Sequence, residues 1–212
     1  MKSSSLAAMA AVLVCAVFPA PGASAAGLTD QEIKAAYYKS YKTEKGGDFK
    51  HAIADLEPVY QAYPTGYTIN LRIGWLHYLD GKHANAKYHY ENAIKVAPSS
   101  VDAKLGYTLP LLAQQDWAKV EAVCYQIVKV DYYDYYANLR LAFALRMQGK
   151  LDLAKEVSYK MLAIHPSDTL YLTELALDLE AVGDKKSSSA IYLDILTMDP
   201  YNATALVKFP KK

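Results

Sequence analysis

Apolar and small side chains recur at helical spacing in the second half of the chain, where the pattern is clearest. Two successive series step at i, i+3, i+4 and i+7, the spacing of one face of an α-helix. The series are Asn138, Leu141, Ala142 and Leu145, followed by Ala154, Val157, Ser158 and Met161. Gly149 lies between them, and glycine readily adopts the left-handed conformation that ends a helix. The pattern predicts two amphipathic helices joined by a tight turn.

This helix pair is one unit of a 34-residue repeat. Three kinds of residue keep the same period. They are the prolines Pro64, Pro98, Pro166 and Pro200, the glycines Gly47, Gly81, Gly149 and Gly183, and the small residues Ala52, Ala86, Ala154 and Ser188. In a pair of antiparallel helices, glycine ends the first helix, the small residue lets the second helix approach closely, and proline stops the second helix. The chain is therefore expected to consist of helix pairs.

The third unit departs from this pattern. Gln115 takes its glycine position, Val120 its small-residue position and Tyr132 its proline position. Pro110 also falls inside its expected first helix, so this unit is predicted to be kinked or slightly reset. Pro58 falls inside the second helix of the first unit.

The repeat resembles that of the tetratricopeptide repeat family, in which small residues occupy positions 8, 20 and 27 and proline occupies position 32. The resemblance covers residues 33 to 202 and implies an all-α fold, a right-handed α-solenoid of five helix-turn-helix repeats within residues 26–202. The repeats are expected at 33–66, 67–100, 101–134, 135–168 and 169–202. The family's usual role is to bind peptides or proteins in a superhelical groove.

The two ends of the solenoid carry their own signals. Thr29 and Glu32 form a capping-box pattern, which predicts that the first helix starts early. Residues 203–212 form a short tail that suffices for one or two helical turns. Because solenoid ends need polar caps, we expect the C-terminal repeat to be poorly capped and covered by something else.

The N-terminus has the three-part pattern of a secretory signal peptide. Lys2 precedes an apolar run from Leu6 to Phe18, and a small-residue stretch ends at Ala25. We expect cleavage after Ala25, removal of residues 1–25, and a periplasmic or secreted protein, since the alanine-rich leader resembles bacterial ones. No later segment is long and uncharged enough for an integral membrane span.

The charge balance, the cysteine and the histidines give no reason to expect nucleic-acid binding, metal binding or catalysis. The mature chain keeps 22 basic and 22 acidic side chains, so its net charge gives no reason to expect nucleic acid as a partner. Only one cysteine, Cys124, remains after cleavage, and it is interpreted as a small core residue. His77, His83 and His89 are spaced by six residues, which does not align two metal ligands on one helix face. We therefore expect no metal, no cofactor and no enzymatic activity.

The family resemblance implies that first-helix positions 2, 5, 9 and 12 line a concave groove. The candidate partner-binding residues are Tyr37, Tyr41, Leu71, Trp75, Tyr78, Leu109, Tyr136, Leu139, Arg140, Phe143, Arg146 and Leu177. Aromatic side chains dominate binding hot spots, which favours a binding surface. The alternative is that positions 5 and 9 merely pack between neighbouring helices. Arg72, Arg140 and Arg146 can pair with an acidic side chain of a ligand, or can be paired or solvated at the surface.

These features predict a non-enzymatic scaffold or adaptor in the cell envelope. Its concave groove is expected to bind an apolar or aromatic segment of another protein, with Arg140 and Arg146 orienting that segment. One alternative is a self-assembling structural protein, in which Tyr192, Ile195 and Leu196 of the last repeat dock on a second copy. A second alternative is a glycan-binding module, suggested by the 19 tyrosines.

Overall fold

The computed structural model describes residues 27–209. This part of the chain forms twelve α-helices and contains no β-strand. The helices are α1 (Asp30–Lys45), α2 (Phe49–Ala54), α3 (Glu57–Ala62), α4 (Tyr67–Leu79), α5 (His83–Val96), α6 (Val101–Ala113), α7 (Trp117–Val128), α8 (Tyr135–Met147), α9 (Leu151–Leu162), α10 (Thr169–Ala181), α11 (Lys185–Met198) and α12 (Ala203–Lys208).

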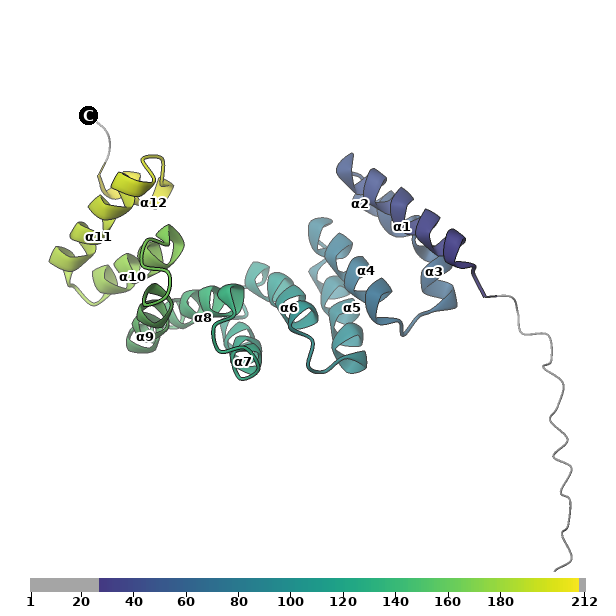
Figure 1. Cartoon of the computed structure of the whole chain (residues 1–212), viewed down its shortest axis with the longest axis horizontal. Helices are drawn as coiled ribbons and strands as arrows, with labels where there is room; N and C mark the ends of the chain where they lie inside the picture. The colour runs from purple at the N-terminus through teal and green to yellow at the C-terminus, as the bar shows by residue number, and fades with distance from the viewer. Residues whose placement is uncertain (1–26, 210–212) are drawn as a thin grey trace, which may run out of the picture.

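The helices stack into an arc, with α1 to α3 at one end and α10 to α12 at the other (Figure 1). Each helix packs chiefly on the helices next to it in the chain, as α5 does on α4 and α6. The first helices of successive pairs also touch, since α4 packs on α6 and α8 packs on α10. Contacts restricted to neighbouring units are the defining property of a solenoid, so the predicted all-α solenoid is confirmed.

The turns within the pairs have the left-handed conformation that the glycine series predicts. The φ angles are 80° at Gly47, 70° at Gly81, 73° at Gly149 and 87° at Gly183. Gln115 adopts the same conformation, with a φ of 58°. The third unit therefore keeps the turn of its neighbours and bears the strain that a side chain causes there.

The residues of the small-residue series lie in the interior of the molecule. The residues in this series are all buried, namely Ala52, Ala86, Val120, Ala154 and Ser188. Between the second and third units, a Cβ atom built on Gly106 of α6 would lie only 2.2 Å from Cε1 of Tyr90 on α5. The Tyr90 ring therefore packs against the bare glycine backbone. Tyr90, Cys124 and Tyr192, which share one interior repeat position, are also buried.

The two irregular prolines have different effects. Pro58 stands in the first turn of α3, and the second helix of the first unit is divided into α2 and α3. Pro110 lies within α6, which is nevertheless a single helix from Val101 to Ala113. Only the last residues of α6 follow Pro110, and its carbonyl still accepts a hydrogen bond from the Gln114 N–H at 3.1 Å. Pro110 therefore does not break α6, and the predicted kink or slight reset of this unit stays a prediction.

Two asparagines fasten the turns between units, a feature that the sequence pattern did not reveal. The Asn70 side-chain amide donates to the carbonyls of Pro64 and Gly66, both at 2.8 Å. The Asn138 amide donates in the same way to the carbonyls of Tyr132 at 3.0 Å and Asp134 at 2.8 Å. Tyr132 thus replaces proline without loss of the turn, because the asparagine bonds to backbone groups that every residue has.

The N-terminal end starts as the capping box predicts. The Thr29 hydroxyl accepts a hydrogen bond from the Glu32 N–H at 3.3 Å, and the Glu32 carboxylate accepts one from the Thr29 N–H at 2.8 Å. Both partners satisfy helix-end groups that would otherwise lack a bond. No helix within residues 27–209 has the combination of length and apolar character that crossing a bilayer requires.

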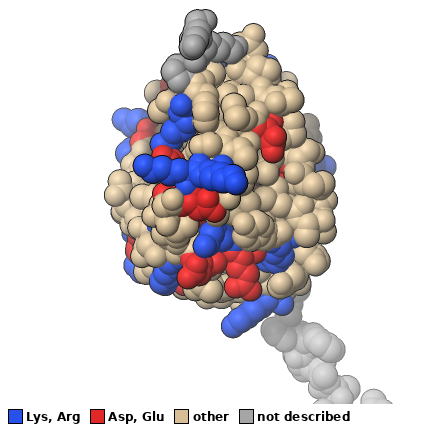
Figure 2. Space-filling model, turned by 90° about the vertical axis from the view of Figure 1, so that its left-hand side faces the viewer, with Lys and Arg blue, Asp and Glu red and all other residues tan. Residues whose placement is uncertain are grey.

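The C-terminal end is covered more fully than the sequence indicates. Helix α12 packs on α11, with Ala205 buried, and Lys208 Nζ lies 2.7 Å from Glu180 Oε1. Tyr192 and Ile195 are buried beneath this cover. Tyr192 and Ile195 therefore offer no surface to a second copy, whereas Leu196, the third residue of that alternative, is half-buried, and self-assembly through this end stays a prediction. Figure 2 shows acidic and basic side chains interspersed over this end of the molecule, as a polar cap requires.

The strained turn of the third unit provides a test of the fold. We expect Gln115→Gly to raise the free energy of unfolding by about 1 kcal/mol, because glycine relieves the left-handed strain at a modest entropic cost. Urea unfolding followed by circular dichroism measures this change. Gln115→Ala is the control, since it removes the same side chain and keeps the strain. An equal gain in both variants would show that φ is not the cause.

Candidate functional site: the concave groove

Three cavities follow one another along the concave side of the arc. The N-terminal cavity has a volume of about 340 Å³ and is lined by Tyr37, Tyr41, Glu44, Thr68, Leu71, Arg72 and Trp75. The central cavity, of about 280 Å³, is lined by Leu71, Trp75, Tyr90, Asp102, Leu105, Gly106, Leu109 and Arg140. The C-terminal cavity, of about 530 Å³, is lined by Leu112, Trp117, Leu139, Arg140, Phe143, Leu170, Thr173, Glu174 and Thr204.

The three cavities form one groove because neighbouring cavities share residues. Leu71 and Trp75 line both the N-terminal and the central cavity, and Arg140 lines both the central and the C-terminal cavity. Most lining residues come from α1, α4, α6, α8 and α10, the first helices of the pairs. We call the surface formed by these three cavities the concave groove, because a ligand can lie in it along the repeats.

The structure brings most of the predicted groove residues to this surface. Those that line a cavity are Tyr37, Tyr41, Leu71, Trp75, Leu109, Leu139, Arg140 and Phe143. Tyr41 is 54% exposed and Trp75 36% exposed, whereas Phe143 is half-buried. Tyr41 and Trp75 are therefore more than packing residues between neighbouring helices, whereas Phe143 is partly buried in that packing.

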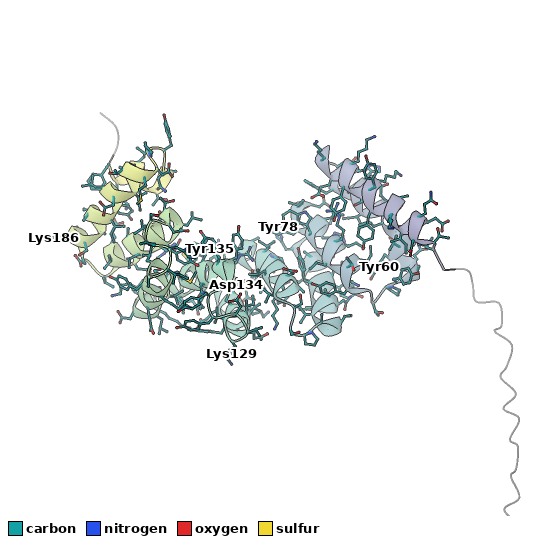
Figure 3. The ribbon with its side chains drawn as sticks, viewed as in Figure 1. Tyr60, Tyr78, Lys129, Asp134, Tyr135 and Lys186 are labelled. Carbon is teal, nitrogen blue, oxygen red and sulfur yellow. The ribbon has the colours of Figure 1, made fainter. Side chains whose placement is uncertain are left out.

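The other predicted residues lie beside the cavities rather than in their walls. Tyr78 packs against Trp75, with ring centroids 5.8 Å apart, and Figure 3 places it on the concave side, opposite to Lys129. Tyr136 is exposed next to Arg140. The remaining two are Arg146 and Leu177, both half-buried.

Two residues of the C-terminal cavity come from outside the first helices of the pairs. Trp117 is the first residue of α7, a second helix, and its ring meets Phe143 edge-on with centroids 5.4 Å apart. Thr204 comes from α12, in the short tail. The repeat period gives no signal for either residue, because each reaches the groove from an element that does not line it elsewhere.

The three groove arginines differ in how their charges are compensated. Arg72 is buried, with Nη1 2.6 Å from Glu44 Oε2. Arg146 Nε lies 3.0 Å from Glu174 Oε2. Arg140 donates from Nη1 to the Leu105 carbonyl and to Thr108 Oγ1, both at 2.6 Å, and both acceptors are neutral. Two of the arginines are therefore paired within the protein.

A buried carboxyl group lies behind the C-terminal cavity. Asp178 on α10 is fully buried, and its oxygens accept no hydrogen bond from any residue in the range 27–209. Burial, together with the nearby Glu174 carboxylate, raises the pKa of Asp178 to about 7, against a partial opposing effect of Arg146. The Arg146 Nε atom is 3.8 Å away, too far for a hydrogen bond.

The histidines are closer together than their spacing in the sequence indicates. The rings of His77 on α4 and His89 on α5 stack with centroids 5.4 Å apart, because antiparallel packing brings the two helices together. The His89 Nδ1 atom lies 2.9 Å from Asn70 Oδ1, and burial lowers the pKa of His89 to about 4. Among the described residues, no group of three or more potential ligands is placed to hold a metal ion.

Cys124 fits the core role that the sequence predicts. Its side chain is fully buried among the helices of the third and fourth units. Burial raises the pKa of its thiol to about 12, whereas a nucleophilic cysteine needs a lowered one.

Solved structures of other proteins have a similar arrangement of helices. MamA from Desulfovibrio magneticus RS-1 superimposes with a TM-score of 0.75 at 16% identity, covering 84% of this chain and 99% of that one. YrrB, described as a TPR protein with an unusual peptide-binding site, superimposes with a TM-score of 0.70 at 12% identity, covering 86% and 94%. The chain has the tetratricopeptide-repeat fold. No family model and no curated protein sequence matches it.

The tetratricopeptide-repeat fold explains why the groove is lined as it is. In each unit the second helix covers the outer side, so side chains of the first helices face inward. Exposed aromatic residues occur on both sides, since Tyr88 on α5 and Tyr159 on α9 are as exposed as Tyr41. Only those of the first helices line the chain of cavities.

The buried Asp178 makes stability depend on pH. Its pKa is higher in the folded protein than in the unfolded chain, so the folded state binds the proton more tightly, and stability falls as pH rises from about 4 to about 7. We expect Asp178→Asn to stabilise the protein at pH 8 by as much as about 4 kcal/mol, and to have little effect at pH 4. Chemical unfolding at both pH values measures the difference.

The control for this prediction is Asp194→Asn, because Asp194 is exposed on α11. The lowered pKa of His89 acts in the opposite direction, since it reduces stability as pH falls below 6.5. Comparing each variant with the wild type at the same pH cancels that effect. A gain that is equal at pH 4 and pH 8 would contradict a neutral Asp178 in the folded protein.

Proposed function

We propose that the protein is a non-enzymatic scaffold that binds an apolar or aromatic segment of another protein in the concave groove. The observation that carries the proposal is the continuity of three cavities along the first helices, with Trp75 and Arg140 at the junctions. A groove of this length suits an extended peptide or a helix, whose side chains enter successive cavities. The peptide-binding site in the description of YrrB is consistent with the same use of the fold.

The chemistry of the groove favours apolar side chains in the ligand. Tyr41 and Trp75 present ring surface that is already held in place: Trp75 Nε1 donates to Glu44 Oε1 at 2.7 Å, and Arg72 lies 3.8 Å over the Tyr41 ring. Binding such rigid rings costs little conformational entropy. The C-terminal cavity, the largest of the three, is walled mainly by leucine, phenylalanine and tryptophan.

Substitutions on the two faces of the solenoid test the role of the groove. The purified protein is crosslinked to the envelope fraction of its host, the captured partner is identified, and a peptide from the crosslinked segment is titrated by fluorescence anisotropy. We expect Trp75→Ala and Phe143→Ala each to weaken peptide binding about tenfold or more, because buried aromatics dominate interfaces. Oligosaccharides, the alternative class of ligand, are titrated in parallel.

Tyr88→Ala and Tyr159→Ala are the controls, since they remove aromatic rings that are exposed on second helices, outside the three cavities. We expect them to leave the affinity unchanged, and circular dichroism must show native helicity for all four variants. Losses that are as large for the controls as for the groove variants would place binding elsewhere. Binding of oligosaccharides and not of peptides would favour the glycan-binding alternative.

The proposal includes export to the periplasm or the exterior, which rests on the leader at residues 1–25. That segment lies outside the described residues. We expect N-terminal sequencing of the protein from its native host to begin at Ala26, and fractionation to recover the protein outside the cytoplasm. A chain that retains Met1 and remains in the cytoplasm would contradict export.

A further inference from the structure

The repeat provides an internal comparison between two groove arginines. Arg72 and Arg140 are 68 residues apart, which is two repeat lengths, and occupy the same place in their units. Both reach back to the first helix of the preceding unit. Arg72 Nη2 donates to Ser40 Oγ at 3.2 Å, and Arg140 Nη1 donates to Thr108 Oγ1 at 2.6 Å. Ser40 and Thr108 are themselves 68 residues apart, so the two junctions are built alike.

The two junctions differ at the residue that neutralises the arginine. At the first, the Glu44 carboxylate pairs with Arg72 at 2.6 Å and accepts a hydrogen bond from Trp75 Nε1 at 2.7 Å. The equivalent of Glu44 at the second is Leu112, 68 residues later. Phe143 likewise stands in place of Trp75 and has no group to donate. The second junction therefore has the apolar Leu112 where the first has the Glu44 carboxylate.

Arg140 consequently keeps a charge that no carboxylate neutralises. Within residues 27–209, no carboxylate lies within ion-pairing distance of it, and its hydrogen bonds go to a carbonyl and a hydroxyl. Among the acidic groups nearby, Glu174 pairs with Arg146 and Asp134 accepts from the Ala137 N–H at 2.7 Å. Asp102 lines the central cavity with Arg140 but forms no ion pair with it. Partial burial also lowers the pKa of the Arg140 guanidinium, which indicates that water solvates the charge incompletely.

The position of Arg140 makes this charge available to a ligand. Its side chain lines both the central and the C-terminal cavity, so any segment that follows the groove between them passes it. Leu112, Leu139 and Phe143 stand with it in the wall of the larger cavity. A partly desolvated guanidinium in apolar surroundings favours a carboxylate strongly, because the hydrogen bonds are charge-assisted and little exposed to solvent.

We propose that Arg140 binds the side-chain carboxylate of an aspartate or glutamate in the partner segment, whose neighbouring apolar side chains fill the C-terminal cavity. This inference rests on the proposed function. The ligand carboxylate takes the place at Arg140 that Glu44 takes at Arg72. Because Arg72 is already neutralised, the acidic residue is recognised at one point of the groove only, and this fixes the register and direction of the bound segment.

Selection from a synthetic library of short peptides with blocked termini tests the preference. We expect the peptides enriched on the wild-type protein to carry an acidic residue next to aromatic or aliphatic ones. In a selected peptide, replacing Glu by Gln, or Asp by Asn, is expected to weaken binding about tenfold or more. Arg140→Gln is expected to abolish the difference between the acidic peptide and its amide counterpart, and Arg140→Lys to retain part of it.

Supplying the missing carboxylate within the protein gives a sharper test. Leu112→Glu recreates the first junction, and we expect its carboxylate to occupy Arg140 and to weaken acidic peptides about tenfold or more relative to Leu112→Gln. Leu112→Gln is the matched control, because glutamine has nearly the same shape and no charge. Circular dichroism and thermal unfolding must show that both variants remain folded.

The outcomes separate this inference from the proposed function. Selected peptides that need Trp75 and Phe143, yet show no acidic preference, would overturn the role of Arg140 and support the groove. Equal binding by Leu112→Glu and Leu112→Gln would also overturn it. If a parallel library with free C-termini gives peptides that lose binding when the terminal carboxylate is amidated, and not when Glu is replaced by Gln, the side-chain proposal is wrong. If no peptide is enriched, or enrichment is unchanged in Trp75→Ala and Phe143→Ala, both proposals fail.

Discussion

Close packing between helices that are neighbours in the chain is the interaction on which the rest of this structure depends. A single helix pair cannot bury its apolar faces, so each unit is stabilised by the next. That packing requires small side chains at the helix crossings, such as Ala86 and Ala154, and bare backbone at Gly106, where the Tyr90 ring lies against α6. Because every contact is local, small rotations between units add up to an arc with a continuous inner wall.

The inner wall has a different chemistry at each end. At the N-terminal cavity, Glu44 neutralises Arg72 and holds the Trp75 ring, so the polar groups satisfy one another. At the C-terminal cavity, Leu112 and Phe143 replace Glu44 and Trp75, and the cavity is larger. The same arrangement of helices thus contains one arginine, Arg72, that is paired with a carboxylate and another, Arg140, that is not. This asymmetry gives the groove a direction, which a uniform repeat would lack.

Titratable groups with shifted pKa values lie within the helix packing of the scaffold. Burial and the nearby Glu174 charge raise the pKa of Asp178, whereas burial lowers the pKa values of His77 and His89, whose rings stack in the second unit. Their effects on stability have opposite signs as pH changes. The second unit also contains Asn70, which links His89 to the turn between units. The protonation of these groups therefore affects the stability of the scaffold.

The sequence by itself determined the helix pairs, the turns, the buried interior positions and most of the groove residues, because a strict 34-residue period assigns each residue a place relative to its own unit. Only the tertiary structure decided what depends on neighbouring units or on elements outside the period. Trp117 and Thr204 reach the groove from α7 and α12, and α12 covers Tyr192 and Ile195. The pairing of Arg72 with Glu44, and its loss at Arg140, likewise arises between units. Such contacts join residues about thirty positions apart, and their geometry is set by how the helices pack.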